Sequence, residues 1–182
     1  MLAVYQASSD GQKFNSNFIV FVSACENPEA LKEQIPGASL SASSYYRNRL
    51  SQSPIRSRLT TVEDSNGVGA WPSWQVDNNQ WIQADFFSVK TIFKISTKGR
   101  NELSAAYNQW VTKYQLKYGT SSNEADFQYV TSDGGDVITF DGNIDRDSVV
   151  ENEFAKIFAR VLRLCPTEWH IHISLRWEVY GC

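Results

Sequence analysis

Two histidines stand one residue apart near the carboxyl end of the chain, at His170 and His172. Residues at i and i+2 of a strand share a face, and two imidazoles on one face can bind zinc. Zinc also requires a third and a fourth ligand, and Cys165 lies only a short turn away. No ligand motif completes the set. The sequence therefore favours two exposed histidines on a polar strand face over a metal-dependent enzyme that uses this pair.

A second group of residues could bind a metal ion. Asp141, Asn143 and Asp145 alternate acidic and amide side chains, as in the first half of a calcium-binding loop. Arg146 occupies the position that is glycine in an EF-hand, and Asn152 stands where the bidentate glutamate is required. Calcium is therefore the weaker interpretation of this segment. The sequence predicts neither a metal nor another cofactor.

Catalytic and nucleic-acid-binding functions find little support in the residue types. The sequence contains no nucleophile signature, glycine-rich phosphate loop or HExxH helix, so we do not expect an enzyme. The formal net charge is −3 and the pI is about 5.4. Basic residues are scattered apart from one local group, Arg47, Arg49, Arg56 and Arg58. Nucleic acid is excluded as an expected partner, because such proteins usually carry a basic face.

The elements that must position these residues are strands. Four segments alternate apolar and polar residues with period two, which predicts strands with one buried face. They are residues 81–86, 89–97, 111–118 and 171–179. In the last one, Ile171 to Val179 puts every second residue inward and leaves His170, His172, Ser174, Arg176 and Glu178 on the polar face. Turn clusters at 64–67, 77–79, 132–135 and 141–143 separate short strands, and no helix longer than a turn or two is expected.

The amino-terminal residues 1–24 are predicted to lie outside the domain, which we expect over residues 25–182. No apolar run approaches the roughly 20 residues of a membrane span. Phe18 to Val22 is short and apolar, and Val22-Ser23-Ala24 has small residues where signal peptidase cuts. A remnant of a signal peptide, a linker and an edge strand remain alternatives for this leader.

Between Cys25 and Cys182, the order of short motifs resembles that of the discoidin family, also called coagulation factor V/VIII type C domains. The series runs through Ala42-Ser43-Ser44, Arg58-Leu59, Gly69-Ala70-Trp71, Trp81-Ile82-Gln83-Ala84-Asp85-Phe86, Thr97-Lys98-Gly99-Arg100, Trp110-Val111-Thr112-Lys113-Tyr114 and Phe140-Asp141-Gly142-Asn143. It continues through Val149-Val150, Ala159-Arg160-Val161-Leu162-Arg163-Leu164, Pro166-Thr167-Glu168-Trp169 and Ile173-Ser174-Leu175-Arg176-Trp177-Glu178-Val179-Tyr180-Gly181-Cys182. The family includes the discoidin domains of neuropilins, lactadherin and contactin-associated proteins.

This resemblance implies an all-β fold, a jelly-roll-like antiparallel β-sandwich of the galactose-binding-domain type with three protruding ligand-binding loops. It also implies a non-catalytic, extracellular adhesion module, secreted or part of the ectodomain of a larger cell-surface protein. Members bind sugars, anionic phospholipid or proteins, and the fold does not choose among them.

A terminal disulfide belongs to the same resemblance. Cys25 and Cys182 stand at the two limits of the patterned region, and the termini of a compact domain often lie close together. Cys165 is then unpaired. It is either an inert buried thiol or the site of an intermolecular disulfide that would give a dimer.

The three loops are carried over by position. The first is Tyr46, Arg47, Asn48, Arg49 and Leu50; the second is Trp74, Gln75, Val76, Asp77 and Asn78; the third is Arg100, Asn101, Glu102, Leu103 and Ser104. Two leucines and a valine would contribute only a few kcal/mol to membrane insertion at about 25 cal/mol per Å². Aromatic and amide side chains, by contrast, stack on sugar faces and hydrogen-bond to hydroxyls. We therefore expect a cell-surface glycan or protein ligand ahead of an anionic phospholipid surface.

Two further residues match positions that line a ligand cleft in neuropilin-type members, Tyr46 and Asp85. Ala105 and Gln109 stand near the places of that cleft's hydroxyl-bearing partners, so a pocket for a carboxyl-terminal arginine is not expected. For Asp85, a purely structural role at the end of its strand is the alternative.

Overall fold

A computed structural model describes residues 25, 27–102 and 104–182. Within them the chain forms nine strands and six short 3-10 turns and no longer helix. The strands are β1 (Glu29–Ala30), β2 (Leu40–Ala42), β3 (Trp71–Pro72), β4 (Ile82–Lys98), β5 (Trp110–Gly119), β6 (Gln128–Tyr129), β7 (Phe140–Asp141), β8 (Val150–His170) and β9 (Ser174–Gly181). The turns are η1 (Gly37–Ser39), η2 (Tyr46–Asn48), η3 (Leu50–Gln52), η4 (Pro54–Ser57), η5 (Ala105–Tyr107) and η6 (Glu124–Asp126).

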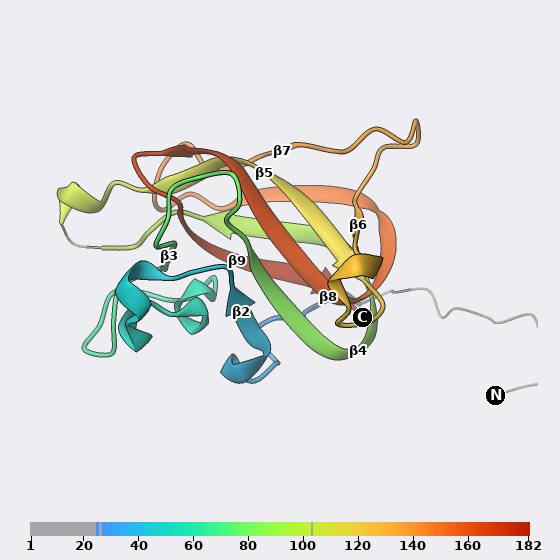
Figure 1. The fold of residues 1–182 in the computed structure, drawn as a ribbon, viewed down its shortest axis with the longest axis horizontal. Helices are drawn as coiled ribbons and strands as arrows, with labels where there is room; N and C mark the ends of the chain where they lie inside the picture. Colours follow the sequence, from blue (N-terminus) through green and yellow to red (C-terminus); the bar gives the residue numbers. More distant parts are fainter. Residues whose placement is uncertain (1–24, 26, 103) are drawn as a thin grey trace, which may run out of the picture.

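Two long bent strands fold the sheet into a sandwich. Their antiparallel ladder shifts register between Asp85 and Lys90, and at that bend both strands pass from one layer to the other. The first half of β4 lies between β2 and the second half of β8, which continues to β5. Its second half lies between the first half of β8 and β9. Figure 1 shows both strands curving round near the carboxyl terminus, away from the loops that follow β2 and β4.

The core lies between the layers and is dominated by large apolar side chains. Trp71, Tyr114 and Trp177 are fully buried with a set of aliphatic residues from β4, β5, β8, β9 and the turn before β9. These aliphatic residues are Ile82, Ile92, Ile95, Leu116, Leu162, Leu164, Ile173 and Leu175. The predicted all-β sandwich is confirmed. The two predicted strands 81–86 and 89–97 are one bent strand, because the ladder with β8 continues across the bend.

The prediction of a solvent-facing polar side on the last strand is wrong. Ser174, Arg176 and Glu178 are as buried as the apolar residues between them. Loop segments cover this side, and the polar groups are satisfied inside it. Glu178 accepts hydrogen bonds from the backbone N–H groups of Lys32, Glu33 and Val179 at 2.6, 2.9 and 2.8 Å. These hydrogen bonds offset part of the cost of burying the carboxylate, although burial still raises the pKa of Glu178.

Arg176 joins three loops from the same buried side of β9. Its guanidinium donates to the carbonyl oxygens of Gly99, Thr61 and Arg146 at 2.7, 3.0 and 2.9 Å. Burial lowers the pKa of Arg176 to about 10, and the side chain stays charged at neutral pH. The loop end of the sandwich is therefore anchored to the core strand by one cation.

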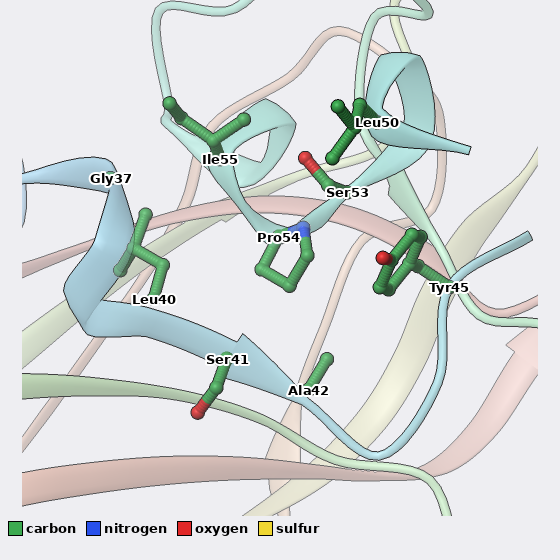
Figure 2. Close-up of a pocket in the computed structure, with 9 residues that line it drawn as sticks. All are labelled: Gly37, Leu40, Ser41, Ala42, Tyr45, Leu50, Ser53, Pro54 and Ile55. Carbon is green, nitrogen blue, oxygen red and sulfur yellow. The ribbon is translucent and has the colours of Figure 1, made fainter. Parts of the chain in front are cut away.

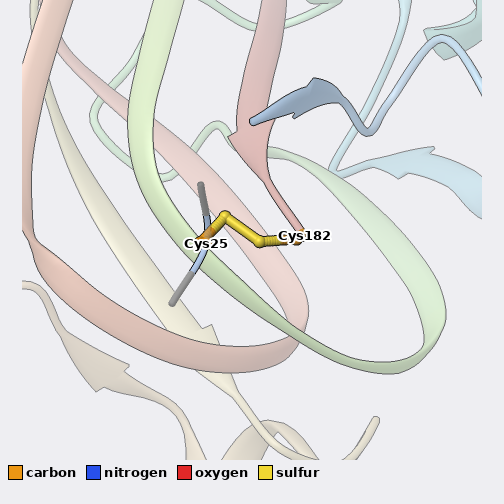
Figure 3. The surroundings of a disulfide bond; sticks show 2 residues. All are labelled: Cys25 and Cys182. Atoms are coloured by element: carbon orange, nitrogen blue, oxygen red, sulfur yellow. A yellow bond between two sulfur atoms is a disulfide. The ribbon is translucent and has the colours of Figure 1, made fainter. Parts of the chain in front are cut away.

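The two ends of the domain meet at the other end of the sandwich, beside the bend. Cys25 and Cys182 form the predicted disulfide, with 5.9 Å between their Cα atoms (Figure 3). Cys182 also exchanges two backbone hydrogen bonds with Thr91, at 2.8 and 3.0 Å. Residues 1–24, with the predicted leader, lie outside the described residues, so the domain boundary stays a prediction. No helix among the described residues has the length and apolarity needed to cross a membrane.

Candidate functional site

The first predicted loop is held in a tight conformation that presents its tip to solvent. Arg47 and Asn48 both have φ of 52°, a left-handed conformation that non-glycine residues seldom adopt. The side chains of Arg47, Asn48 and Arg49 are exposed, and Leu50 is 80% exposed. Tyr46 turns the other way and is half-buried, with its ring 5.2 Å from that of Trp74 in an edge arrangement. The loop therefore separates an outer tip from an inner aromatic residue.

The second loop is braced from within by its own polar groups. Asp77 Oδ1 accepts hydrogen bonds from the backbone N–H of Asn79 and from Gln80 Nε2, both at 2.9 Å. The backbone N–H of Trp74 donates to Ser44 Oγ at 3.0 Å, which ties this loop to the segment before the first one. Trp74, Val76 and Asn78 are left exposed. This loop contributes the Trp74 ring to the rim beside Tyr46.

The third loop contains a buried cation. Arg100 is ion-paired with Glu102, donates to Gln109 Oε1 at 3.0 Å, and has its guanidinium 4.3 Å from the centre of the Tyr107 ring. Asn101 donates its backbone N–H to the carbonyl of Gly69 at 3.0 Å. A Cβ on Gly69 would lie 1.5 Å from the Asn101 carbonyl oxygen, so only glycine permits this approach. Leu103 lies outside the described residues.

A pocket of about 250 Å³ opens between the first and third loops. It is lined by Tyr46, Gln52, Val68, Pro72, Arg100, Glu102, Tyr107, Gln109 and His172. Ligand pockets for drug-sized molecules measure about 300–1,000 Å³. This one therefore has room for a single sugar ring or a single side chain. Of the predicted site residues, the structure brings Tyr46, Arg100 and Glu102 together here and leaves the loop tips outside.

Several buried polar groups of the pocket have spare hydrogen-bonding capacity. Gln52 is 9% exposed as a residue, and its side-chain amide has no hydrogen-bond partner among the described residues. Gln109 is 8% exposed. Its Oε1 accepts hydrogen bonds from Arg100 and from Ser174 Oγ, whereas the N–H groups of its Nε2 have no acceptor among the described residues. These amide groups still reach solvent, because the fully buried side-chain polar atoms without a partner in the described residues belong to Thr97, Asn143 and Thr167. The pocket therefore offers polar groups that water or a polar ligand can bind.

His172 is a pocket residue that the strand pattern did not reveal. The expected strand from 171 begins only at Ser174, because residues 170–172 form a tight turn in which the backbone N–H of His172 donates to the His170 carbonyl at 2.7 Å. Ile171, predicted to point inward, has φ of 62° and is 62% exposed. The two histidines have different neighbours. The ring of His170 stacks on that of Trp110 with 4.1 Å between ring centroids, whereas the ring of His172 lies edge-on to that of Tyr46 with 6.2 Å between centroids.

The structure does not bring Asp85 to the pocket. This residue lies where the two long strands bend, towards the disulfide end of the sandwich. Both of its carboxylate oxygens accept hydrogen bonds from Arg160 at 2.9 Å, and these bonds lower the pKa of Asp85. The expectation that Asp85 lies beside Tyr46 in a common cleft is therefore corrected. The geometry agrees with the alternative, a structural role at the end of the strand.

The two metal hypotheses find no assembled site in the structure. No group of three or more His, Cys, Asp or Glu side chains in the described ranges is arranged to hold a metal ion. In the segment that resembles a calcium loop, Asp145 accepts three hydrogen bonds from its own turn: from the backbone N–H groups of Asp147 and Ser148 and from Ser148 Oγ. These bonds lower the pKa of Asp145, and they give the carboxylate a turn-forming role.

Cys165 is a free thiol that is mostly covered by its surroundings. Burial raises the pKa of the Cys165 thiol, which reduces the thiolate fraction at neutral pH. Thiolate is the form that forms disulfides. The structure therefore gives no support to a dimer joined through this residue.

A wider hollow of about 420 Å³ lies on the flank of the first loop (Figure 2). It is lined by Gly37, Leu40, Ser41, Ala42, Tyr45, Leu50, Ser53, Pro54 and Ile55. Its polar side-chain atoms are hydroxyls, and no charged or amide group enters it. It offers apolar surface but little that would orient a polar ligand, unlike the pocket between the loops.

The fold and the site together define a class: an antiparallel sandwich with a small polar pocket between loops at one end. The model of the F5/8 type C domain family matches residues 39–179, and the chain belongs to this family. Its domains are extracellular, non-catalytic binding modules.

Individual relatives agree with this assignment. The chain is 36% identical to human retinoschisin over 121 residues, covering 65% of this chain and 52% of that protein. It is 30% identical to bovine lactadherin over 167 residues, covering 88% of this chain and 38% of that protein. The structure of discoidin II of Dictyostelium discoideum has a TM-score of 0.65 and 32% identity, covering 78% of this chain and 54% of that one. The chain spans about half or less of the length of these relatives.

Proposed function

We propose that this domain is an extracellular adhesion module that binds one sugar ring of a cell-surface glycan, or one polar side chain of a protein ligand, in the pocket between its loops. The observation that carries the proposal is the set of nearly buried side chains with unused hydrogen-bonding capacity, above all Gln52 and Gln109. Tyr46 and Tyr107 add aromatic surface at the same place. A sugar ring combines these two needs, since it has an apolar face and a rim of hydroxyls.

The charge of the pocket supports an uncharged ligand at neutral pH. Arg100 and Glu102 are paired with one another and are both shielded from solvent. The remaining lining side chains are neutral when His172 is neutral. A ligand with a net charge would therefore lose its hydration without gaining a free counter-charge. This favours a neutral sugar over an acidic or basic group.

Peripheral binding to an anionic phospholipid membrane is the second candidate. Its support is the outer rim, by which we mean the exposed side chains Arg47, Arg49 and Leu50 of the first loop and Ile171 of the turn between β8 and β9. Leu50 is 80% exposed and Ile171 is 62% exposed. Scattered apolar tips of this size contribute a few kcal/mol at about 25 cal/mol per Å². The cations would add an attraction that salt screens. The rim and the pocket are different surfaces, so the two functions can be separated by substitution.

The proposed function is tested with a glycan array followed by calorimetry on the sugars that bind, using the wild type, Tyr46→Ala and the matched control Tyr129→Ala. Tyr129 is exposed on β6, outside the pocket. We expect Tyr46→Ala to weaken sugar binding about tenfold, since losing one aromatic contact costs roughly 1.4 kcal/mol. Tyr129→Ala should bind like the wild type.

A second experiment, sedimentation with vesicles that contain phosphatidylserine, can contradict the proposed function. If the wild type binds no sugar on the array but sediments with these vesicles, and Leu50→Ser abolishes the sedimentation, the phospholipid function is correct and the pocket is not the site. The rim would then carry the binding.

A further inference from the structure

Resting on the proposed function, we propose that His172 determines the charge of the ligand: its neutral ring accepts a hydrogen bond from a hydroxyl of an uncharged sugar, and protonation of the ring releases that sugar. The residue belongs to the pocket by geometry, since it lines the same wall as Tyr46 and Gln109. The family resemblance alone did not point to it. Its position depends on the tight turn that joins β8 to β9.

The hydrogen bonds of the ring define which nitrogen is free. Nδ1 of His172 lies 3.1 Å from the carbonyl oxygen of Ile173. A carbonyl only accepts, so in the neutral ring Nδ1 carries the proton and donates it, and Nε2 keeps its lone pair. No described residue supplies a partner for Nε2. A sugar hydroxyl can supply the missing donor, and a protonated Nε2 would face that same hydroxyl as a competing donor.

The neighbouring charges oppose protonation of His172. The titratable and charged groups that line the pocket with it are Arg100 and Glu102 from the third loop, Tyr46 from the first and Tyr107 from η5. Glu102 is already paired with Arg100. Burial lowers the pKa of His172, and the charge of Arg100 lowers it further. Because the pKa lies below the ordinary histidine value of about 6.5, the ring is neutral at pH 7.5.

Protonation changes what the pocket accepts. With His172 neutral, the charges of Arg100 and Glu102 cancel and an uncharged ring fits. With His172 protonated, the pocket carries one uncompensated positive charge and its acceptor nitrogen is gone. An uncharged sugar then loses a hydrogen bond, which is worth about tenfold in affinity at full protonation. A sugar that carries a carboxylate gains a partner instead.

The test measures binding of galactose, N-acetylgalactosamine, N-acetylglucosamine and mannose by calorimetry at pH 7.5 and pH 5.0. For the wild type we expect the best-binding neutral sugar to bind more weakly at pH 5.0 than at pH 7.5, because acid favours the protonated ring. His172→Gln keeps an acceptor that does not titrate and should bind equally at both values. His170→Gln is the matched control, since His170 stacks on Trp110 outside the pocket, and it should keep the pH dependence.

Fixing the charge gives a second, independent variant. His172→Lys places a permanent positive charge in the pocket and should bind the neutral sugar weakly at both pH values, while glucuronate binds more tightly than it does to the wild type at pH 7.5. A pH dependence that survives in His172→Gln, or a wild type that binds the sugar equally at both pH values, would overturn the role of His172 and leave the proposed function standing. Absence of binding by all four sugars at both values would instead contradict sugar binding by the pocket, on which this role of His172 rests.

Discussion

Replacing the terminal disulfide with Cys25→Ser and Cys182→Ser lowers the free energy of unfolding by about 3–5 kcal/mol. The bond closes a loop between residues 157 positions apart. In the chain-entropy model, a closed loop of this length restricts the unfolded chain by roughly 5 kcal/mol at 25 °C, and residual structure in the unfolded state reduces the gain. The bond also fixes Cys182, whose backbone pairs with Thr91 at the bend of β4. The measurement is urea unfolding of the double variant and the wild type, without reductant.

Cys165→Ala provides the control for this comparison. The thiol is mostly buried but lies outside the disulfide, and its removal deletes only one small atom group from the core, so a loss below about 1 kcal/mol is expected. A double variant as stable as the wild type, or a Cys165→Ala variant that loses as much as the double variant, would contradict the stabilising role of the Cys25–Cys182 bond.

Arg176→Leu is expected to lower the free energy of unfolding by about 3 kcal/mol and to weaken ligand binding at the same time. Leucine retains apolar bulk but leaves the carbonyl groups of Thr61, Gly99 and Arg146 without their donor. Hydrogen bonds from a charged group contribute roughly 1.5–3 kcal/mol each, and their sum is reduced where water reaches a freed carbonyl. The measurement is the same unfolding experiment, combined with sugar binding by the folded fraction.

Arg176→Lys separates charge from geometry, because an ammonium cannot bond three divergent carbonyls as a planar guanidinium does. We expect it to be almost as destabilising as Arg176→Leu. Arg49→Leu is the matched control: its side chain is exposed, and no described residue forms an ion pair or side-chain hydrogen bond with it. Full stability of Arg176→Lys would show that charge alone holds the loops, and unchanged stability of Arg176→Leu would show that they do not depend on this residue.

The sandwich and the disulfide could be predicted from the sequence because both depend on patterns along the chain that do not change with the loops packed around the strands. Alternation places Leu162 and Leu164 on one face whatever lies outside, and Cys25 and Cys182 mark the limits of the pattern. The exposure of β9 was predicted wrongly for a physical reason. Alternation reports polarity, and buried Arg176 and Glu178 have partners inside the protein that no local pattern reveals.

The pocket was only partly predictable. The loops named from the resemblance contain Tyr46, Arg100 and Glu102, but Gln52 lies beyond the first loop and His172 lies in a different part of the chain. His172 joins them because the left-handed conformation of Ile171 interrupts the expected strand, so that β9 begins only at Ser174. Long-range contacts of this kind depend on the folded backbone. Asp85 shows the converse error, since a position matched in sequence lies at the other end of the sandwich.

The measurement that tests the central claim most directly is a sugar titration followed in ¹⁵N correlation spectra of the wild type at pH 7.5. The side-chain amides of Gln52 and Gln109 give signals of their own and report on the pocket itself. We predict that a sugar identified on the array shifts these two amide signals together with the backbone signal of His172, while the signal of Leu50 at the rim stays in place. Shifts confined to Leu50 and Ile171, with both glutamine amides unchanged at saturation, would show that the rim and not the pocket binds the ligand.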